Sequence, residues 1–350
     1  MRLIEEHNVE DYLRETGRIA ADEKVSARRL SGGVSNEVFH VRRSGGEDFV
    51  LKQAREQLRV PDPWFSRVER IHREAEVLRV CQELLGDADN DSREARTPEI
   101  LFEDRENFAF AMTAAPREHV VWKQELLAGR ADLEIAACCG RLLGRMHGRS
   151  WHGADVASRL EDRSFFEELR IDPYYRTVAE VHPDLKPALT DLIDSARSER
   201  HALTHADFSP KNLLVFPGGL LMVDFETGHY GDPAFDLGFF LSHLVLKSFH
   251  HAPRHAAFLE LISRFWETYL PEVQPQAGDA ATEALVRRGI SHFAGCALAR
   301  LDGKSKIDYL EPPDRRDAVR GLCRELLLNP LARWEDALPM IHARIDRLIG

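Results

Sequence analysis

The residues best suited to chemistry lie at positions 205–212, which read His-Ala-Asp-Phe-Ser-Pro-Lys-Asn. This segment contains Asp207 and ends at Asn212, and Asp224 follows twelve residues later. Amide and carboxylate oxygens suit magnesium, and a further carboxylate beside the metal can orient a reacting hydroxyl. The three residues therefore indicate phosphoryl transfer, provided that the fold brings them together.

The chain between Asn212 and Asp224 is predicted to form a β-hairpin. Two apolar runs, 213–216 and 220–223, flank the Pro-Gly-Gly of 217–219, which is typical of a turn. If position 216 pairs with 220, the same register places Asn212 opposite Asp224, about 4.5–5.5 Å away and on the same face. The alternative interpretation is a surface loop with a capping Asp and a turn Asn.

Two glycines near the N-terminus are expected to approach phosphate groups. Residues 25–30 and 37–41 are predicted strands, and Gly32, Gly33, Ser35 and Asn36 lie in the loop between them. A glycine lets backbone N–H groups approach phosphate oxygens without a Cβ in the way. Gly-Gly hairpins are also common as purely structural turns, so the loop alone leaves both interpretations open.

Lys52 ends the apolar strand 49–52 and could reach the phosphates of a nucleotide. A lysine at a strand end is also typical of a solvent-facing edge. The predicted helix 68–84 offers two ion-pair partners, Glu74 and Glu76, on different sides of that helix.

With these motifs the chain resembles the aminoglycoside phosphotransferase and choline kinase family, from about residue 25 to about residue 245. The resemblance implies an α+β, bilobal, protein-kinase-like fold, with an antiparallel sheet in the small N-terminal lobe and a larger, mainly helical C-terminal lobe. It implies ATP and Mg²⁺ as cofactors. In its terms Asp207 is the catalytic base, and Asn212 and Asp224 bind magnesium.

The resemblance also covers the nucleotide site. The form Gly-Gly-x-Ser-Asn is similar to the family's phosphate loop, and Glu74 is favoured over Glu76 as the partner of Lys52. Residues 113–116 would form the hinge between the lobes, with backbone groups facing adenine, while a core role for Met112 is an equal alternative. The residues expected at the nucleotide are Gly32, Gly33, Ser35, Asn36, Lys52, Glu74, Met112, Thr113 and Ala114.

Two departures from protein kinases favour a small-molecule substrate. Ser209 stands where protein kinases usually have Lys, and Glu226 replaces the Gly of Asp-Phe-Gly. Residues 231–233, Gly-Asp-Pro, follow soon after, which leaves no room for a long activation loop. The resemblance implies that Asp236, the Asp of the family's Asp-Leu-Gly motif, supports the catalytic loop by hydrogen bonding and that His205 orients it.

The C-terminal part is predicted to be mainly helical. Apolar residues recur at helical spacing in 133–147, and 165–169, 185–196 and 236–246 are further helices. We expect residues 1–115 to form the nucleotide-binding lobe and residues 116–350 the catalytic and substrate-binding lobe.

The composition excludes several classes of protein. The net charge of −11 over 350 residues argues against a nucleic-acid partner. No apolar run could span a membrane, and the N-terminus lacks a signal peptide. Five cysteines without zinc spacing suit a reducing, cytoplasmic location. The oligomeric state is not determined by these features.

Two other motifs are rejected. Residues 303–305, Gly-Lys-Ser, resemble the end of a P-loop, but the first glycine is absent and a helical pattern precedes them. His250, His251 and His255 could suggest a metal site. Pro253 breaks the helix that would align them, so a solvated loop is favoured.

The acceptor is expected between Asp207 and the helical lobe. Two polar clusters, one in the predicted loop 172–176 and one near residue 302, could bind it or could be surface. An acidic pocket would suit an aminoglycoside or choline, whereas basic residues would suit a carboxylate or phosphate. The candidates are Asp172, Tyr174, Tyr175, Arg300, Asp302 and Lys304.

These features predict an ATP-dependent phosphotransferase that moves the γ-phosphate to a hydroxyl of a small molecule, such as an aminoglycoside, an amino alcohol or a sugar. A nucleotide-binding pseudokinase with a regulatory role is the main alternative. The presence of Lys52, Glu74, Asp207, Asn212 and Asp224 together argues against it. A protein kinase is the other alternative.

Overall fold

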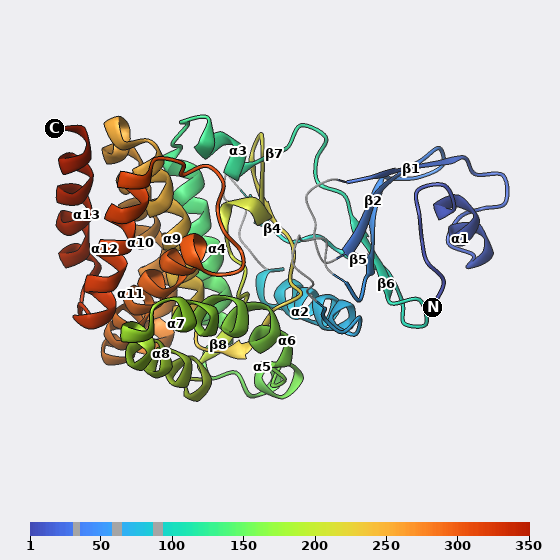
Figure 1. Ribbon diagram of the computed structural model, residues 1–350. Helices are drawn as coiled ribbons and strands as arrows, with labels where there is room; N and C mark the ends of the chain where they lie inside the picture. Colours follow the sequence, from blue (N-terminus) through green and yellow to red (C-terminus); the bar gives the residue numbers. More distant parts are fainter. Residues whose placement is uncertain (31–35, 58–64, 87–93) are drawn as a thin grey trace.

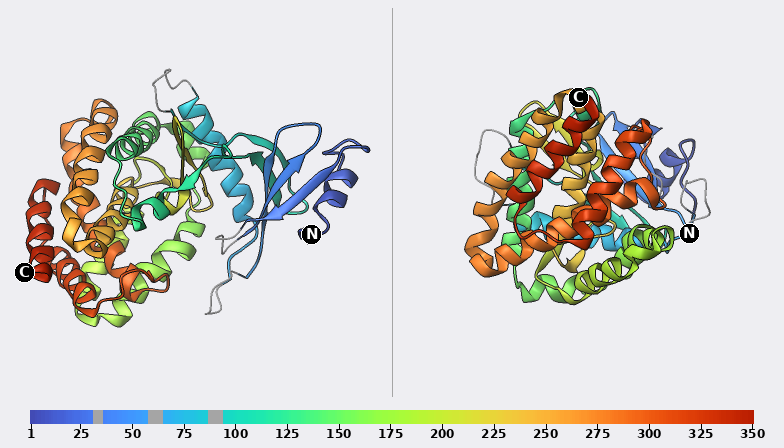
Figure 2. Two further views of the ribbon diagram at one scale, coloured as in Figure 1. Left: turned by 90° about the horizontal axis from the view of Figure 1, so that it is seen from above. Right: turned by 60° about the vertical axis from the view of Figure 1, so that its left-hand side comes forward.

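The computed structural model describes residues 1–30, 36–57, 65–86 and 94–350, which form two lobes (Figure 1). The smaller lobe holds an antiparallel sheet, and the larger lobe holds most of the helices. Figure 2 shows the lobes side by side, with the two termini at opposite ends. The expected α+β, bilobal, protein-kinase-like architecture is confirmed.

The sheet of the smaller lobe has the strand order β1-β2-β3-β6-β5, and all neighbours are antiparallel. Its strands are β1 (Val25–Arg29), β2 (Asn36–Arg43), β3 (Phe49–Ala54), β5 (Ile100–Asp104) and β6 (Ala109–Thr113). The helices of this lobe are α1 (Val9–Glu15) and α2 (Arg70–Leu85).

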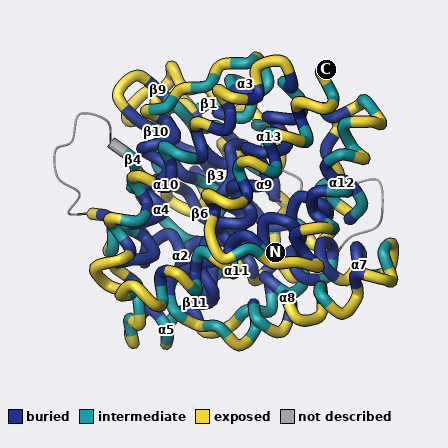
Figure 3. Tube along the Cα trace, turned by 90° about the vertical axis from the view of Figure 1, so that its left-hand side faces the viewer, coloured by how far each residue is buried: buried dark blue, intermediate teal, exposed yellow. Residues whose placement is uncertain are grey.

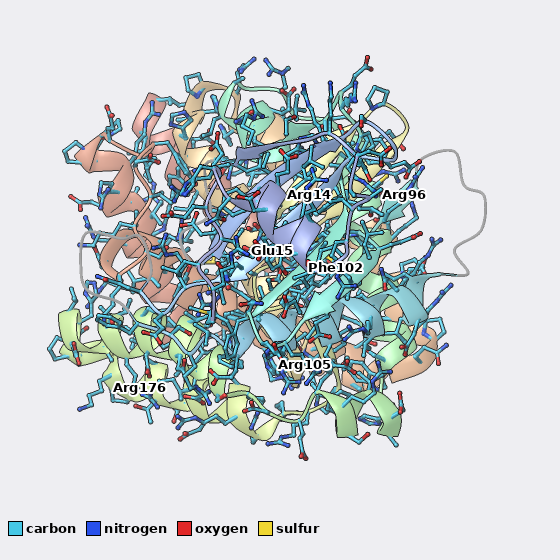
Figure 4. All side chains as sticks on the ribbon, turned by 90° about the vertical axis from the view of Figure 1, so that its right-hand side faces the viewer. Arg14, Glu15, Arg96, Phe102, Arg105 and Arg176 are labelled. Atoms are coloured by element: carbon cyan, nitrogen blue, oxygen red, sulfur yellow. The ribbon has the colours of Figure 1, made fainter. Side chains whose placement is uncertain are left out.

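Strand β3 directs its side chains to both faces of this sheet. Phe49 and Leu51 pack with Tyr12 of α1 in a small apolar cluster on the outer face. Figure 4 views the lobe from this side. Val50 and Lys52 line the cavity between the lobes, because successive strand residues face opposite sides. The alternation therefore places the Lys52 ammonium inside the molecule rather than at a solvent-facing edge.

The larger lobe combines two small sheets with a set of helices. One sheet has the order β4-β10-β9-β7, and the other pairs β8 with β11. The strands are β4 (Glu94–Arg96), β7 (Val120–Val121), β8 (Ala202–Thr204), β9 (Leu213–Phe216), β10 (Gly219–Met222) and β11 (His229–Gly231). Strand β4 pairs in parallel with β10 and so belongs to the larger lobe's sheet.

The helices of the larger lobe follow in chain order. The α-helices of six residues or more are α3 (Trp122–Leu127), α4 (Leu133–Ser150), α5 (Ala154–Arg159), α8 (Lys186–Ser198), α9 (Ala234–His250), α10 (His255–Ala277), α11 (Asp279–Asp302), α12 (Pro313–Leu328) and α13 (Trp334–Ile349). The other helical segments are α6 (Ser164–Phe166), the π-helical η1 (Glu167–Arg176), α7 (Thr177–Val181), η2 (Pro183–Leu185), η3 (Pro210–Asn212) and η4 (Ala252–Arg254).

Helix α9 forms the centre of this lobe and is buried along almost its whole length (Figure 3). It packs against α10 and α11, and α10 packs against α4. The α4–α10 contact is close because Gly140 faces it: a Cβ there would lie 2.4 Å from the carbonyl oxygen of Phe265. No helix in the described residues has the length and apolar character needed to cross a membrane.

The predicted hairpin is present, but the predicted register is wrong by one residue. Phe216 pairs with Gly219 rather than with Leu220. The reason is a turn of only two residues, in which Gly218 takes a φ of +96° that non-glycine residues rarely adopt. The carbonyl of Asn212 consequently accepts a hydrogen bond from the N–H of Val223, at 3.0 Å.

The shifted register alone would send the side chain of Asp224 to the opposite face from the expected one. The backbone of Asp224 corrects this, because it takes a left-handed conformation with a φ of +73°. Asn212 and Asp224 both line the cavity between the lobes. The expected juxtaposition is therefore reached by a different backbone path.

Two further local predictions are corrected. Residues 172–176 lie in the π-helical segment η1 rather than in a loop, and Pro173 is accommodated inside it. The helix does break near Pro253, between α9 and α10, as expected. The histidines there are half-buried or buried rather than freely solvated, however. His251 Nε2 lies 2.9 Å from the carbonyl oxygen of Leu126, and His255 is buried against His342.

Candidate active site

The loop that carries Asp207 is held by one buried carboxylate. Asp236 on α9 accepts hydrogen bonds from the backbone N–H groups of His205, at 2.7 Å, and Ala206, at 2.6 Å. The same carboxylate lies 3.1 Å from Nε2 of His147. The backbone of Ala206 has a φ of +60°, which residues other than glycine rarely adopt. The hydrogen bonding expected of Asp236 is confirmed, and it stabilises this strained backbone.

The ring of His205 contacts the backbone of Asp207, two residues further on. Its ring Nδ1 accepts a hydrogen bond from the backbone N–H of Asp207 at 3.1 Å. The ring is fully buried and packs against Phe225, with centroids 4.9 Å apart. Burial lowers the pKa of His205, so the ring is neutral at pH 7 and can act as this acceptor. The expected orienting role of His205 agrees with these contacts.

Asp207 lies between two cations at the floor of the cavity. Nη2 of Arg170 is 2.8 Å from one carboxylate oxygen, and Nζ of Lys211 is 2.9 Å from the other. Asn212 donates from Nδ2 to the same oxygen as Lys211, at 2.8 Å. Burial raises the pKa of Asp207, but the charges of Arg170 and Lys211 outweigh burial and hold that pKa below its usual value. The carboxylate is therefore ionised throughout the neutral range.

Sequence reasoning missed both of these cations. Lys211 lies within the 205–212 segment itself, four residues after Asp207, so its position was a usable signal. It supplies a charge next to the carboxylate even though Ser209 replaces the usual lysine. Arg170 comes from η1, 37 positions earlier in the chain, and nothing in the local sequence marks it. Its guanidinium also donates to the carbonyl of Ala206 at 2.6 Å.

Lys52 joins the lobes through two carboxylates. Its Nζ is 2.5 Å from Oε1 of Glu74 and 3.0 Å from Oδ1 of Asp224. Burial lowers the pKa of Lys52, but the two carboxylates outweigh burial and raise it overall, so the lysine is protonated. The N–H of Phe225 also donates to Glu74, at 3.3 Å. The structure thus pairs Lys52 with Glu74 rather than with Glu76.

The other predicted nucleotide residues fall into three groups. Met112 and Thr113 line the cavity, together with apolar side chains such as Val38 and Leu221, whereas Ala115 lines it in place of Ala114. Asn36 does not line the cavity; its side chain contacts Arg70 and Glu226. Gly32, Gly33 and Ser35 lie outside the described residues.

Of the residues predicted to bind the acceptor, some line the cavity and others do not. Tyr174, Arg300 and Lys304 line the cavity, and Nη1 of Arg300 lies 3.3 Å from the Tyr174 hydroxyl. Tyr175 points into the core, where its hydroxyl is 2.7 Å from Nδ1 of His292.

The two remaining acceptor candidates make ion pairs away from the cavity. Asp302 pairs with Arg320 and His182, and Asp172 pairs with Arg176. Tyr174 and Tyr175 are neighbours on a helix, so their side chains leave it in different directions and only one can face the cavity.

The cavity between the lobes has a volume of about 1110 Å³. Its N-terminal side combines apolar side chains with Lys52 and the arginines of β1 and β2, its middle holds Asp207, Asn212 and Asp224, and its far side is built by α9, α11 and η1. A nucleotide and a small second molecule can both fit in such a space. Only four residues, 225–228, link Asp224 to β11, so this part of the chain holds no long activation loop.

The fold and this site define a kinase-like phosphotransferase. The chain belongs to the phosphotransferase enzyme family, because a model of that family matches residues 26–287. It is accordingly an ATP-dependent kinase of small molecules.

Two similar curated proteins are methylthioribose kinases. The protein from Yersinia pseudotuberculosis is 25% identical, over 97% of this chain and 93% of that protein. The protein from Pectobacterium carotovorum is 26% identical, over 74% of this chain and 72% of that protein.

Solved structures show the same fold at low identity. A choline/ethanolamine kinase family protein from Mesorhizobium loti has a TM-score of 0.55 and 17% identity, over 95% of this chain and 99% of that one. An amicoumacin kinase bound to AMP-PNP and Ca²⁺ has a TM-score of 0.56 and 14% identity, over 92% and 94%.

Proposed function

We propose that this enzyme moves the γ-phosphate of ATP to a hydroxyl of a small molecule, with Asp207 as the residue that orients the hydroxyl. The observation that carries the proposal is the convergence of Lys52, Asp207, Asn212 and Asp224 on one cavity. They come from strand β3, the loop before η3, η3 itself and the loop after β10. In phosphoryl transfer, positioning and neutralisation of charge supply most of the acceleration. Each of these side chains serves one of those two purposes.

Asn212 and Asp224 fit a magnesium ion. One amide oxygen and one carboxylate are a suitable protein donor set, because magnesium keeps several waters and binds phosphate oxygens as well. The Nδ2 of Asn212 donates to Asp207, which turns its Oδ1 away and leaves that oxygen for a cation. No group of three or more His, Cys, Asp or Glu side chains in the described residues could hold a metal alone. When bound, magnesium would neutralise charge on the phosphates.

Lys52 and the apolar side chains on the N-terminal side of the cavity would hold the nucleotide. The Lys52 ammonium is fixed between Glu74 and Asp224, so it needs little reorganisation to contact phosphate oxygens. Met112, Thr113 and Ala115 lie where the strand β6 leaves the small lobe, and we assign the adenine to this position. Gly32, Gly33 and Ser35 remain part of this proposal.

The reaction step uses Asp207 as a hydrogen-bond acceptor. The acceptor hydroxyl oxygen forms a bond to the γ-phosphorus while the bond from that phosphorus to the bridging oxygen breaks and ADP leaves. The hydroxyl proton passes to the Asp207 carboxylate. Because Arg170 and Lys211 keep this carboxylate ionised and oriented, it is ready to accept at neutral pH.

The test is ATP consumption with magnesium across a panel of hydroxyl acceptors, with the variant Asp207→Asn as control. The panel contains aminoglycosides, choline, ethanolamine, homoserine, methylthioribose, hydroxy acids and sugar phosphates. Turnover that depends on an acceptor and is lost in Asp207→Asn would support the proposal. Magnesium-dependent ATP binding without transfer to any acceptor would support the pseudokinase alternative instead.

A further inference from the structure

The cavity is far more basic than the protein around it. Among the described residues that line it, ten are Lys or Arg and only three are Asp or Glu. The whole chain has the opposite balance, with a net charge of −11. A random sample of this chain's charged residues would therefore give an acidic cavity, and the excess of cations needs a physical reason.

The three cavity carboxylates are already compensated by the protein. Asp207 contacts Arg170 and Lys211, as described, and Asp224 contacts Lys52. Glu226 lies 3.3 Å from Nε of the buried Arg70. The carboxylates thus account for some of the cations but offer little uncompensated charge to a cationic acceptor.

The cations on the far side of the cavity have no such partners. Lys123 on α3, Arg300 on α11 and Lys304 line it, and no described carboxylate lies within 4.0 Å of their charged nitrogens. Arg300 contacts only neutral groups, the hydroxyls of Tyr174 and Ser305, and its Nε is buried without a hydrogen-bond partner. Buried donors of this kind normally have an acceptor.

His243 on α9 adds a second unsatisfied group at the same place. It lines the cavity, only 6% of its surface is exposed, and its Nε2 has no hydrogen-bond partner. Behind it Lys247 is fully buried. Its ammonium donates to the carbonyl of His243 at 3.2 Å and lies 5.3 Å from the centre of the Tyr309 ring, again without a carboxylate.

The charges of this group act on one another. Burial and then the charges of Lys123 and Arg300 lower the pKa of Lys247 to about 7. Burial, followed by Lys247 and Arg300, also lowers the pKa of His243. Buried cations that repel one another destabilise the free protein. An anion bound between them reduces this repulsion and is therefore bound favourably.

The phosphates of ATP do not account for these residues. Lys123, His243 and Arg300 come from α3, α9 and α11 of the larger lobe. The nucleotide side is formed largely by β1, β2, β3 and β6, which contribute cations of their own, Arg28, Arg29, Arg42 and Lys52. Lys123, His243 and Arg300 therefore face the second molecule in the cavity.

We propose that the acceptor carries a negatively charged group, a carboxylate or a phosphate, which binds between Lys123, His243 and Arg300 while its hydroxyl lies at Asp207. This inference rests on the proposed function and specifies the substrate class of the same site. Tyr174 and Phe239, which line the cavity beside Arg300, supply an apolar surface for the carbon skeleton.

The first experiment measures binding of four molecules that share one skeleton and differ in charge: glycerol, glycerate, glycerol phosphate and aminopropanediol. Each is titrated by calorimetry into the full-length protein saturated with AMP-PNP and Mg²⁺, so that the nucleotide position is filled. We expect an anionic member to bind at least about tenfold more tightly than glycerol, because charge-assisted hydrogen bonds replace neutral ones. Tighter binding of glycerate indicates a carboxylate, and tighter binding of glycerol phosphate indicates a phosphate.

The second experiment compares two substitutions on the same helix. Arg300→Gln should remove most of the advantage of the anion, whereas Arg287→Gln, an exposed arginine on α11 that does not line the cavity, should keep it. Lys123→Gln, at a half-buried position without an ion pair, is the second test in case Arg300→Gln alters the fold.

The outcomes separate this inference from the proposed function. Equal binding of all four molecules, tighter binding of aminopropanediol, or an equal loss in Arg300→Gln and Arg287→Gln would overturn the anionic acceptor. Failure of AMP-PNP to bind in the presence of Mg²⁺ would instead overturn the proposed function, before any acceptor is added.

Discussion

Nζ of Lys211 lies 2.9 Å from one oxygen of the Asp207 carboxylate, at the floor of the cavity between the lobes. The pair is built within a single turn of chain, from residues four positions apart. Arg170 contacts the other oxygen from a distant element. An ionised carboxylate held from both sides has a fixed direction, and this direction is what a positioned hydroxyl requires.

Replacement of Asp207 by Asn is expected to lower kcat by about 10²–10⁴-fold, because the amide keeps the shape but cannot accept the hydroxyl proton. The thermal unfolding midpoint should change little compared with this loss. Steady-state turnover and circular dichroism on the same preparation provide the two measurements. A kcat within about tenfold of the wild type would contradict the role given to Asp207.

Replacement of Arg170 by Met is expected to shift the acid limb of the pH profile of kcat/KM to higher pH. In the wild type the pKa of Asp207 is held below its usual value, so the carboxylate stays ionised in mildly acidic solution. Activity therefore falls only at still lower pH. Removing one cation raises this pKa toward the usual value of an aspartate. Lys211→Met is the matched variant, at a half-exposed side chain, and should shift the limb in the same direction. An unchanged limb in both variants would argue against Asp207 as the titrating group.

Replacement of Asp224 by Asn is expected to raise the magnesium concentration needed for half-maximal activity by about tenfold or more, because a neutral amide replaces the charged ligand. Asn212→Ala should act in the same direction. The matched control is Asp308→Asn, an exposed carboxylate of the larger lobe. Titration of activity with Mg²⁺ at saturating ATP gives the measurement, and equal midpoints for Asp224→Asn and the control would exclude Asp224 as a ligand.

Replacement of Gly238 by Ala is expected to lower the free energy of unfolding by about 1–3 kcal/mol through overpacking. A Cβ at this position of α9 would lie 2.4 Å from the backbone nitrogen of Phe293 on α11, so one helix has to move. Gly321→Ala on α12 is the control, since its Cβ would meet only the end of the Arg344 side chain. That variant should be neutral or stabilised by up to about 1 kcal/mol. Urea unfolding of both proteins measures the difference.

Replacement of Lys247 by Met is expected to stabilise the protein at low pH. Burial and neighbouring charges lower the pKa of Lys247 in the folded protein to about 7, so the unfolded chain binds a proton at this lysine more tightly. The resulting loss of folding stability is fully present below pH 7. It disappears as the pH rises from 7 toward the usual pKa of lysine. The stability gained by Lys247→Met should therefore be largest near pH 6 and shrink toward pH 10. A gain in the free energy of unfolding that does not depend on pH would show that the charge of Lys247 does not destabilise the folded protein.

Much of the site follows from short stretches of sequence. Asp207, Asn212 and Asp224 are linked by a strand, a turn and a strand, and alternation along β3 fixes the direction of Lys52. Such relationships depend on spacing over a few residues, which the sequence contains. The register was predicted one residue out, because turn residues such as Pro217 and Gly218 allow more than one loop length.

Other features depend on contacts between distant segments. Arg170 reaches Asp207 across 37 positions, and Tyr174 rather than Tyr175 faces the cavity because of how η1 is rotated against α11. Whether a charge lines a site or pairs elsewhere is decided in the same way: Arg300 faces the cavity while Asp302, two residues on, pairs with Arg320.

The sequence by itself determined the class of chemistry, because the residues to which we assign the reaction, the metal and the nucleotide lie in local patterns of recognisable type. The tertiary structure alone decided the charge of the proposed acceptor site. That charge is a sum over Lys123, His243 and Arg300, which come from three helices. Electrostatic interactions of this kind depend on distance and burial, and for residues far apart in the sequence both are set by the tertiary structure.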